Sequence, residues 1–362
     1  MHKKAFGIQI KPIGNNCNLR CKYCYAAPFA KPEIKTIPLD TLETAIRKTF
    51  EFQNDIFFTW HGGEPMVPGL DFYESVVEIM NKYKAPEHIV RNMIQTNATL
   101  ITPEFAEFFV KNNFTPSVSI DGPEDIHNKN RIKFGGYGSF DMVMAGVKNL
   151  RDAGINPPVI ATVTKESLPH VDGVFNFLVD NGFTDIKFSP VYDSATDEFS
   201  INSDDWFNYL NRILHLWIEH GNPDISIREL DEIIAWLSNE TINLCTSTNA
   251  CVNWISLDPD GNIYPCEYLR SEMPYGNIMN MELSDLYKIV SYKKFKQLFL
   301  HKNEKCQKCA FSKLCGNGCP ATRVKDSQLT HDGVYVYCEQ RKRLFKEVSD
   351  LFESEKTDCI PS

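Results

Sequence analysis

Three cysteines near the start of the chain constrain its chemistry more than any other feature. Cys17, Cys21 and Cys24 lie within eight residues, directly after an apolar alternating run. If this segment wraps as a loop, its thiols turn toward one point, and three thiolates suit a [4Fe–4S] cluster, which normally takes four cysteine ligands. The fourth iron would then lack a protein ligand, and an open coordination position is typical of a catalytic metal site.

A zinc knuckle and a group of buried free thiols are the alternatives for this segment. A zinc knuckle needs a fourth Cys or His close by, and residues 25–35 contain neither. The spacing therefore favours the cluster.

The pattern Cys17-x3-Cys21-x2-Cys24, with the aromatic Tyr23 before the last cysteine, resembles the signature of the radical S-adenosylmethionine (SAM) enzymes. The resemblance implies that the amino and carboxylate groups of SAM chelate the open iron and that Tyr23 lies at the cofactor site. It also implies that SAM is cleaved to methionine and a 5′-deoxyadenosyl radical, which abstracts a hydrogen atom from the substrate.

Length, charge and cysteine usage exclude several classes of protein. A chain of 362 residues, 43% of them hydrophobic, can bury a large core and form two or three domains. Its net charge is −9 and the sequence contains no stripe of basic residues, so we expect no nucleic acid partner. It has neither a signal peptide nor an apolar run of about 18 residues, so we expect a cytoplasmic protein without a membrane partner. Twelve cysteines in a reducing compartment indicate metal or cluster ligation rather than disulfides.

Strand-like and helix-like segments alternate through the first half of the chain. Strands are expected at 5–11, 56–60, 89–95, 116–120, 158–164 and 185–190, and helices at 39–52, 70–83, 103–112, 139–153 and 170–181. This alternation predicts the α/β class, with a parallel sheet forming a partial (β/α)6 barrel of the TIM type. In such barrels the working residues lie at the C-terminal ends of the strands.

We expect the chain to divide into four parts. They are a partial barrel at 1–199, two bridging amphipathic helices at 200–239, a cysteine-rich domain at 240–345, and a C-terminal helix and tail at 346–362.

A glycine-rich loop directly follows the second predicted strand. It reads His61-Gly62-Gly63-Glu64-Pro65. Paired glycines let backbone groups approach a ligand, and the carboxylate can hold an ammonium group or fix the loop, although a plain strand-to-helix turn would look the same. Its position resembles the motif with which radical SAM enzymes hold the amino group of SAM. We expect Trp60 and His61 to face the same opening.

The next two predicted strands also end in polar residues. Asn97 ends the third strand, Ser119 ends the fourth, and Arg131 follows a short distance later. Resemblance to the peptide-maturing branch of the family places Asn97 at the cofactor and implies that Ser119 and Arg131 contact the carboxylate and ribose region of SAM. A surface ion pair is the alternative for Arg131.

Eight more cysteines lie between Cys245 and Cys338, enough for two complete four-ligand sets. A zinc ribbon is the alternative, because the pair Cys306 and Cys309 also suits zinc. The segment from Asp258 to Gly261, before Cys266, predicts a hairpin with a type I′ turn.

This cysteine array resembles the SPASM domain of radical SAM peptide maturases. The resemblance, and not the spacing, implies which cysteines hold each auxiliary cluster. The first set is Cys245, Cys251, Cys266 and Cys319, and the second is Cys306, Cys309, Cys315 and Cys338. The expected cofactors are therefore three [4Fe–4S] clusters and SAM, with Cys359 left over as an idle thiol.

The overall pattern is similar to that of the anaerobic sulfatase-maturating enzymes, with two departures. Those enzymes carry an aspartate, proposed as the catalytic base, after the third ligand of the first auxiliary cluster, and here the residue is Glu267. They also carry a tyrosine two residues after the last cysteine of the first motif, where this chain has Ala26. Glu267 is thus a candidate catalytic base or a structural carboxylate.

The sequence therefore predicts a radical SAM oxidoreductase that modifies a peptide or protein by hydrogen abstraction and then oxidation or cross-linking. A ribosomally made precursor peptide is the expected substrate, and maturation of a sulfatase, by oxidation of Cys or Ser to formylglycine, is the first alternative. A SAM-dependent dehydrogenase or epimerase of small molecules is the second, and a non-catalytic iron–sulfur or zinc module is the third. The enzymatic hypothesis also implies an external electron donor of the flavodoxin or ferredoxin type.

Overall fold

The computed structural model describes residues 5–31, 33–191, 198–242, 244–248, 250–270, 273–300, 304–325, 328–329 and 333–358. The chain forms two compact units, each built from separate stretches of sequence. The first comprises Met1–Ile120, His127–Val159 and Cys251–Gln297, and the second comprises Asp121–Ile126, Ile160–Ala250 and Leu298–Ser362.

Parallel strands form the centre of the first unit. They are β1 (Phe6–Ile10), β2 (Asp55–Trp60), β3 (Ile89–Thr96), β4 (Phe114–Ser119) and β8 (Trp254–Leu257), in the order β8-β1-β2-β3-β4. Ile8 of β1 pairs with Phe58 on one side and with Ile255 on the other. Strand β8 therefore joins the cysteine-rich part of the sequence to the strand that precedes the cysteine loop.

Strands β9 (Asn262–Tyr264) and β10 (Gly276–Asn277) extend this sheet beyond β8 in antiparallel fashion. The predicted hairpin between β8 and β9 is confirmed, but the predicted type I′ turn is wrong. The Gly261 amide donates to the Asp258 carbonyl at 3.0 Å, and only Gly261 has a positive φ, at 83°. Pro259 cannot adopt a positive φ, so the turn is of type I followed by a left-handed glycine.

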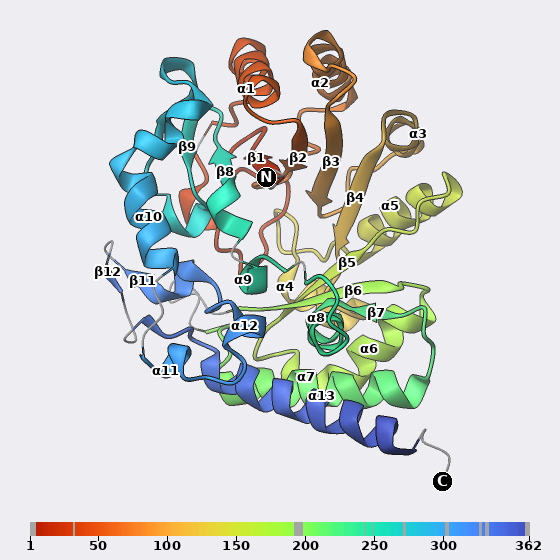
Figure 1. Ribbon diagram of the computed structural model, residues 1–362. Coiled ribbons are helices and arrows are strands. Elements are labelled where there is room, and N and C mark those ends of the chain that lie inside the picture. Colours follow the sequence, from red (N-terminus) through yellow and green to blue (C-terminus); the bar gives the residue numbers. More distant parts are fainter. Residues whose placement is uncertain are drawn as a thin grey trace. The chain divides into compact units, whose positions relative to one another are not determined.

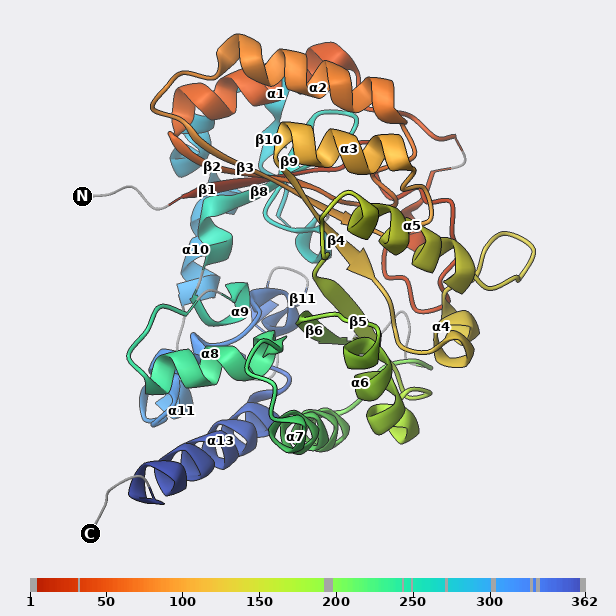
Figure 2. The same ribbon diagram turned by 90° about the vertical axis from the view of Figure 1, so that its right-hand side faces the viewer.

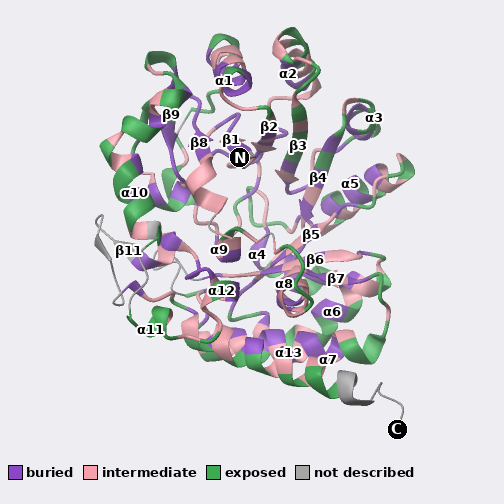
Figure 3. Ribbon diagram, viewed as in Figure 1, coloured by how far each residue is buried: buried purple, intermediate pink, exposed green. Residues whose placement is uncertain are grey.

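Helices cover one side of strands β1 to β4 (Figures 1 and 2). They are α1 (Leu39–Phe52), α2 (Leu70–Tyr83) and α3 (Pro103–Asn112), and α5 (Phe140–Asp152) packs against α3. The short helix α4 (Glu124–Asn130) is not part of this layer. Thr102 caps α3 by accepting from the Phe105 amide at 3.3 Å, and Asn113 ends it with a φ of 54°. The helix faces turned toward the strands are buried (Figure 3).

Trp60 lies inside this layer and does not face the opening at the strand ends, so that expectation is wrong. Burial alternates along β2, and this turns Trp60 toward α2, where its ring lies edge-on to Tyr73 at 5.6 Å. The Tyr73 hydroxyl donates to the Pro65 carbonyl at 2.8 Å. The aromatic core thereby holds the end of the glycine-rich loop.

The second unit contains shorter strands and the longest helices. Its strands are β5 (Val159–Val163), β6 (Asp185–Pro190), β7 (Ser226–Ile227), β11 (Val324–Lys325) and β12 (Gln328–Leu329). Its helices are α6 (Val171–Asp180), α7 (Ser203–His220), α8 (Arg228–Leu237), α9 (Cys245–Thr248), α11 (Glu304–Gln307), α12 (Ser312–Cys315) and α13 (Cys338–Asp358). Helix α13 packs against α7 and α8 (Figure 1).

The remaining elements are helix α10 (Val290–Leu300) and short 3-10 turns. The turns lie at Ala27–Phe29, Leu168–His170, Ala250–Asn253, Glu267–Leu269, Ile278–Asn280, Leu283–Lys288 and Pro320–Arg323. The predicted α/β class with a cysteine-rich C-terminal part is confirmed, while the four predicted domain boundaries stay a prediction. No helix of the described residues is long and apolar enough to cross a membrane.

Candidate active site

The cysteine loop leaves the C-terminal end of β1 and is held together by its own backbone. The Leu19 amide donates to Cys17 Sγ at 3.3 Å, and the Cys24 amide donates to the Cys21 carbonyl at 3.1 Å. All three thiols are half-buried, and those of Cys17 and Cys24 are close enough to interact electrostatically. The loop is therefore a compact turn that presents sulfur atoms with amide donors around them.

A second segment braces this loop from outside. The Arg20 and Lys22 amides donate to the carbonyl oxygens of Ile132 and Asn130 at 2.7 and 3.0 Å. These bonds place the predicted cofactor residue Arg131 beside the cysteine loop. Its guanidinium carbon lies 5.5 Å from the centre of the Tyr23 ring, and both side chains are buried.

The backbone of Arg131 is also fixed from behind. Ser139 Oγ donates to the Arg131 carbonyl at 2.8 Å, and His127 Nε2 lies 3.0 Å from the same Ser139 oxygen. His127 is fully buried. Arg131 is thus a positioned side chain within the fold, and the alternative of a surface ion pair does not describe it.

The paired glycines pack against the segment that leads into the cysteine loop. A Cβ atom on Gly63 would lie 1.5 Å from the Asn16 carbonyl oxygen, and one on Gly62 would lie 2.5 Å from the Gly14 carbonyl oxygen. The Gly63 amide donates to that Gly14 oxygen at 2.8 Å. The glycines are needed for this contact between two loops, whether or not a ligand also approaches them.

Glu64 turns its carboxylate into the protein and fixes the loop. Oε1 accepts from the Met66 amide at 3.0 Å and from the Thr96 hydroxyl at 2.7 Å, and Oε2 accepts from the Asn97 amide at 2.8 Å. Burial raises the pKa of Glu64 to about 7, although these hydrogen bonds favour its ionised form. The glycine-rich loop is therefore tied to the end of β3.

Asn97 completes the link between β3 and the cysteine loop. Its Nδ2 donates to Asn18 Oδ1 at 2.9 Å and points to Cys17 Sγ at 3.7 Å. Ser119, at the end of β4, accepts from Gln95 Nε2 at 3.0 Å. The structure thus brings Asn97 to the cysteines and places Ser119 at the end of the neighbouring strand.

These residues fit a [4Fe–4S] cluster with SAM. Half-buried thiols on one loop accept hydrogen bonds from an amide and a carboxamide, and such bonds are among the features that tune protein-bound clusters. In the first unit the cysteine loop, the glycine-rich loop and the end of β3 are joined by direct hydrogen bonds.

Glu267 lies in the same unit, immediately after Cys266, at the centre of a buried polar network. Its Oε2 accepts from the Lys11 ammonium and from the Tyr264 hydroxyl, the latter at 3.0 Å, and its Oε1 accepts from Asn15 Nδ2 at 2.8 Å. Burial would raise the pKa of Glu267, but the charge of Lys11 and these hydrogen bonds hold it below its usual value. Glu267 is therefore an ionised, buried carboxylate.

No pattern in the sequence predicts the partners of Glu267. Lys11 is 1% exposed and lies at the end of β1, while Tyr264 closes β9. The one available signal was a lysine that directly follows an apolar strand. Tyr25 was also missed: its ring stacks on Tyr268 with centroids 4.7 Å apart.

The cysteines of the first auxiliary set belong to both units. In the first unit, Cys251 and Cys266 both interact electrostatically with Tyr275. In the second unit, Cys319 interacts with Cys245.

The second auxiliary set lies wholly in the second unit. Cys306 and Cys309 follow one another on one turn, where the Cys309 amide donates to the Cys306 carbonyl at 3.4 Å, and Cys338 interacts electrostatically with Cys315 and Cys306. Gly316, Asn317 and Gly318 all have positive φ values, of 56°, 75° and 69°. The chain after Cys315 is thus bent tightly, as the glycines predict. Cys359 lies outside the described residues.

Comparison with known proteins gives two family matches. Residues 12–178 match the radical SAM superfamily, and residues 245–310 match the SPASM iron–sulfur cluster-binding domain. A cysteine-type anaerobic sulfatase-maturating enzyme of Clostridium novyi is 31% identical over 98% of both chains. The chain belongs to the radical SAM family.

Other relatives and solved structures agree with this assignment. A serine-type anaerobic sulfatase-maturating enzyme of Bacteroides thetaiotaomicron is 28% identical over 99% of this chain and 92% of its own. The structure of anSMEcpe with bound AdoMet and a peptide superimposes with a TM-score of 0.85 at 26% identity, covering 98% and 99% of the two chains. The peptide maturase SuiB of Streptococcus suis shares the fold, with a TM-score of 0.67 at 18% identity, covering 92% and 75%.

This radical SAM protein is therefore an enzyme that modifies a peptide or protein, as the sequence predicts. Its two domain types bind SAM and iron–sulfur clusters. The prediction that its partner is a peptide or protein substrate is confirmed.

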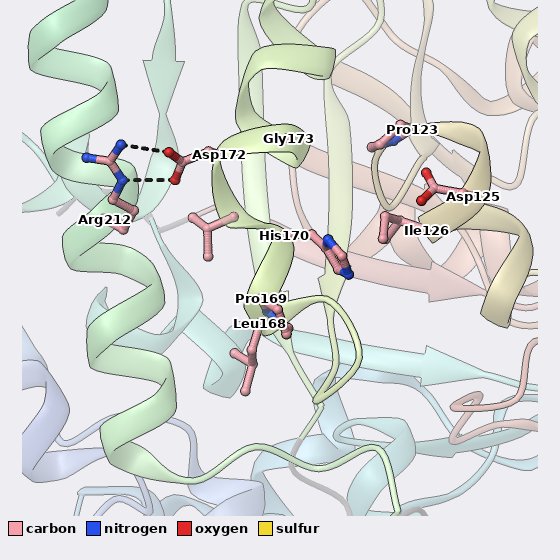
Figure 4. Close-up of a pocket in the computed structure, with 10 residues that line it drawn as sticks. Pro123, Asp125, Ile126, Leu168, Pro169, His170, Asp172, Gly173 and Arg212 are labelled. Atoms are coloured by element: carbon pink, nitrogen blue, oxygen red, sulfur yellow. Dashed lines mark hydrogen bonds and ion pairs between the residues drawn. The ribbon is translucent and has the colours of Figure 1, made fainter.

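The second unit of this radical SAM enzyme also contains an open cavity of about 470 Å³ (Figure 4). It is lined by Pro123, Asp125, Ile126, Leu168, Pro169, His170, Val171, Asp172, Gly173 and Arg212. Figure 4 shows the pair of Arg212 and Asp172 at one wall, joined at 2.9 and 2.7 Å, and Asp125 at the opposite one. None of the residues predicted for SAM or the clusters lines this cavity.

Proposed function

We propose that this radical SAM enzyme matures a sulfatase by oxidising a cysteine or serine side chain to formylglycine, the first alternative that the sequence suggests. Its relatives are named as cysteine-type and serine-type anaerobic sulfatase-maturating enzymes. The observation that carries this proposal is the likeness over 98% of both chains to a cysteine-type enzyme. This reverses the order of the two substrate hypotheses that the sequence suggested, because SuiB shares only the fold.

The proposed cofactor site uses the residues joined in the first unit. Cys17, Cys21 and Cys24 hold a [4Fe–4S] cluster, and the remaining contacts are to SAM. They come from Tyr23, Gly62, Gly63, Pro65, Asn97, Ser119 and Arg131, while Glu64 belongs to the site by positioning the loop that carries the glycines. Bound there, the cluster and SAM would supply a 5′-deoxyadenosyl radical that abstracts a hydrogen atom from the substrate. The geometry supports Glu64 as the residue that fixes this loop rather than one that reaches outward, because its carboxylate already accepts three hydrogen bonds from the protein.

Glu267 is the proposed acceptor of the substrate proton. It is ionised, it lies next to Cys266, and Lys11 opposite it balances its charge. Removal of a hydrogen atom and a proton from the substrate leaves one electron to be accepted, and the proposed acceptors are two auxiliary [4Fe–4S] clusters on the ligand sets given above. A serine side chain becomes the aldehyde directly, whereas a cysteine side chain becomes a thioaldehyde, which water hydrolyses to the aldehyde with release of hydrogen sulfide. A flavodoxin or ferredoxin is the proposed donor that reduces the N-terminal cluster.

A direct experiment separates the two substrate hypotheses. The reconstituted enzyme is incubated anaerobically with SAM, a low-potential reductant and either a sulfatase peptide with a central cysteine or a precursor peptide from a neighbouring reading frame. Aldehyde formation, detected by mass spectrometry and hydrazide labelling, supports formylglycine synthesis. A product that has lost two hydrogen atoms and carries no aldehyde would instead support cross-linking of the precursor peptide.

A further inference from the structure

Two arginines lie among the cysteines of the second unit, and neither was predicted from the sequence. Arg341, on helix α13, donates from Nη1 to the Cys315 carbonyl at 3.0 Å and to Cys315 Sγ at 3.6 Å. Its Nη2 donates to the Thr246 hydroxyl at 2.8 Å. Its guanidinium carbon lies 4.8 Å from the centre of the Tyr335 ring. Contacts with Cys315, Thr246 and Tyr335 thus hold the Arg341 guanidinium in place.

Arg323 follows the last cysteine of the short-spaced array and is fully buried. It donates to the Leu298 carbonyl at 3.4 Å. Its charge interacts with Cys319, Cys306 and Cys315, and burial lowers its pKa. Two cations therefore surround Cys315.

Nearby negative charge stabilises a guanidinium that is half-buried, as that of Arg341 is. Transfer of a guanidinium away from water is costly unless it is paired with an anion and hydrogen-bonded. In the described part of the chain, no carboxylate forms an ion pair with Arg341, and its hydrogen bonds go to carbonyl, hydroxyl and sulfur atoms. The thiolates and inorganic sulfides of a cluster would supply the missing negative charge.

We propose that Arg341, supported by Arg323, compensates the charge of the cluster held by Cys306, Cys309, Cys315 and Cys338 and so raises its reduction potential. This inference rests on the ligand set proposed above. Hydrogen bonds to ligand sulfurs and local charge are established determinants of cluster potential. Reduction adds one electron to the bound cluster, which becomes more negative by one charge, while no bond breaks and no proton moves. A fixed cation beside Cys315 stabilises that reduced state most.

The same helix offers a matched control. Arg343 lies two residues further along α13, forms an ion pair with Asp204 at 2.5 Å and covers the Phe207 ring at 3.8 Å. It is an arginine of the same helix with a carboxylate partner and no contact to a cysteine among the interactions described. Arg343→Met therefore removes an equal charge away from the ligand set.

The test is a redox titration of the reconstituted holoenzyme with dithionite, followed by electron paramagnetic resonance, with iron content measured in parallel. We expect Arg341→Met to lower the reduction equilibrium constant of one auxiliary cluster by at least about tenfold, which is a shift of ~59 mV for a one-electron couple. Arg341→Lys should shift it less, because it keeps the charge, and Arg343→Met should leave it unchanged. Full iron content with an unchanged potential in Arg341→Met would overturn the proposal.

Two further variants keep this result separate from the ligand assignment. If Arg341→Met loses iron, Arg341→Gln, which retains amide donors without the charge, takes its place, and an unchanged potential there also overturns the proposal. Cys306→Ala tests the ligand set itself. If Cys306→Ala retains all iron and every cluster signal, the proposed ligands are wrong, and the role of Arg341 fails with them. A loss of one cluster in Cys306→Ala together with an unchanged potential in Arg341→Met refutes the charge effect alone.

Discussion

At the scale of single residues, the ion pair of Lys11 and Glu267 is the most consequential arrangement in the first unit. Both side chains are buried, with exposed fractions of 1% and 5%. A pair of this kind adds little net stability compared with apolar residues, but loss of one partner leaves an uncompensated buried charge. Because stability alone does not explain a buried pair beside Cys266, we expect it to have a chemical role.

Removal of Lys11 alone should destabilise the protein strongly. Lys11→Met removes the nearer cation of the buried Glu267 carboxylate and leaves only the longer pair with Arg270, at 3.9 Å, among the interactions described. We expect a loss of about 3–5 kcal/mol in the free energy of unfolding. The double variant Lys11→Met/Glu267→Gln should recover much of this loss, because no buried charge remains. Chemical unfolding of the two variants at equal cluster loading measures both free energies of unfolding.

Lys48 provides the control for that experiment. Its buried ammonium donates to the carbonyl oxygens of Ile278 and Met281 at 3.0 and 2.8 Å, and its ionic partner Glu282 is 57% exposed. Lys48→Met should cost only about 1–3 kcal/mol, the usual penalty for unsatisfied buried polar groups. Equal losses in Lys11→Met and Lys48→Met would contradict the importance of the buried carboxylate.

Exchange of Glu267 for glutamine tests the proposed proton acceptor. A positioned general base contributes about 10²–10⁴-fold to a rate, so Glu267→Gln should lower peptide oxidation by about that factor. Formation of 5′-deoxyadenosine should persist, because the proposed cofactor contacts are unchanged. Since Glu267→Gln also leaves Lys11 buried without this anion, the double variant Lys11→Met/Glu267→Gln is assayed beside it at equal cluster loading. Chromatography of the oxidised peptide and of 5′-deoxyadenosine gives the ratio of these two products. Tyr264→Phe is the comparison variant, because it removes only one hydrogen bond to the Glu267 carboxylate. Normal peptide oxidation in Glu267→Gln would exclude the role.

At the scale of elements, the contact between two loops decides whether the site assembles. The backbone of residues 14–16 occupies the space where Gly62 and Gly63 would otherwise carry Cβ atoms. The cysteine loop is thus positioned by β2 as well as by its own strand.

Gly63→Ala should therefore separate the two loops. Its Cβ would lie 1.5 Å from the Asn16 oxygen, and overpacking of this severity costs about 1–3 kcal/mol or more. We expect weaker SAM binding and loss of iron from the N-terminal cluster, measured by equilibrium dialysis and iron analysis. Gly173→Ala is the matched control, because a Cβ at that helical position meets nothing within 4 Å. Unaltered SAM binding in Gly63→Ala would refute this account of the loop.

Helix α8 carries a pH-sensitive residue in its first turn. Glu229 accepts from the Phe188 amide at 3.2 Å, and burial raises its pKa to about 7. Between the unfolded pKa near 4.5 and a pH of about 7, the folded state holds a proton that the unfolded state has lost. Stability from Glu229 should therefore fall as the pH rises through this window.

Glu229→Gln should flatten that dependence. One proton of difference contributes at most about 1.4 kcal/mol per pH unit, so the slope between pH 5 and pH 7 should decrease by up to that amount. Asp172→Asn is the control, because Arg212 lowers the pKa of this exposed carboxyl and its titration lies below the window. Unfolding of the three proteins is compared at several pH values. Identical slopes would show that Glu229 is ionised throughout.

The sequence predicts the local elements well and the long-range partners poorly. The bounds of α1, α2 and α3 agree with the apolar periodicity and with caps such as Thr102. Periodicity carries no information about Lys11 and Glu267, which lie 256 residues apart. It also cannot reveal that β8 pairs with β1, because a parallel pair is not joined by a tight turn whose sequence could be recognised.

The candidate site shows the same division. The cysteines and the glycine-rich loop were found because their residue types and spacing resemble a known signature. Arg341 is not predicted because its contact with Cys315 joins residues 26 apart in the sequence, and Tyr264 is not predicted because no motif marks it. The turn after Asp258 was assigned wrongly because Pro259 excludes the φ values that the Asp-Gly pair alone suggests.

At the scale of the whole molecule, the N-terminal cysteine loop and the second predicted auxiliary set lie in different units. The N-terminal loop is bonded to the glycine-rich loop and to β3 within the first unit, whereas the second auxiliary set lies entirely in the second. Each set therefore has its own local framework. Loss of a ligand in one set should not remove the supports of the other.

Cys17→Ala and Cys306→Ala should consequently fail in different ways. Cys17 accepts from the Leu19 amide and lies beside Asn97, so its loss should abolish formation of 5′-deoxyadenosine. Cys306→Ala leaves those contacts intact, and some 5′-deoxyadenosine should still form while peptide oxidation is lost. Anaerobic assays of both products, with iron content as the check on loading, make the comparison. Equal yields of 5′-deoxyadenosine from both variants would mean that the two frameworks are not independent.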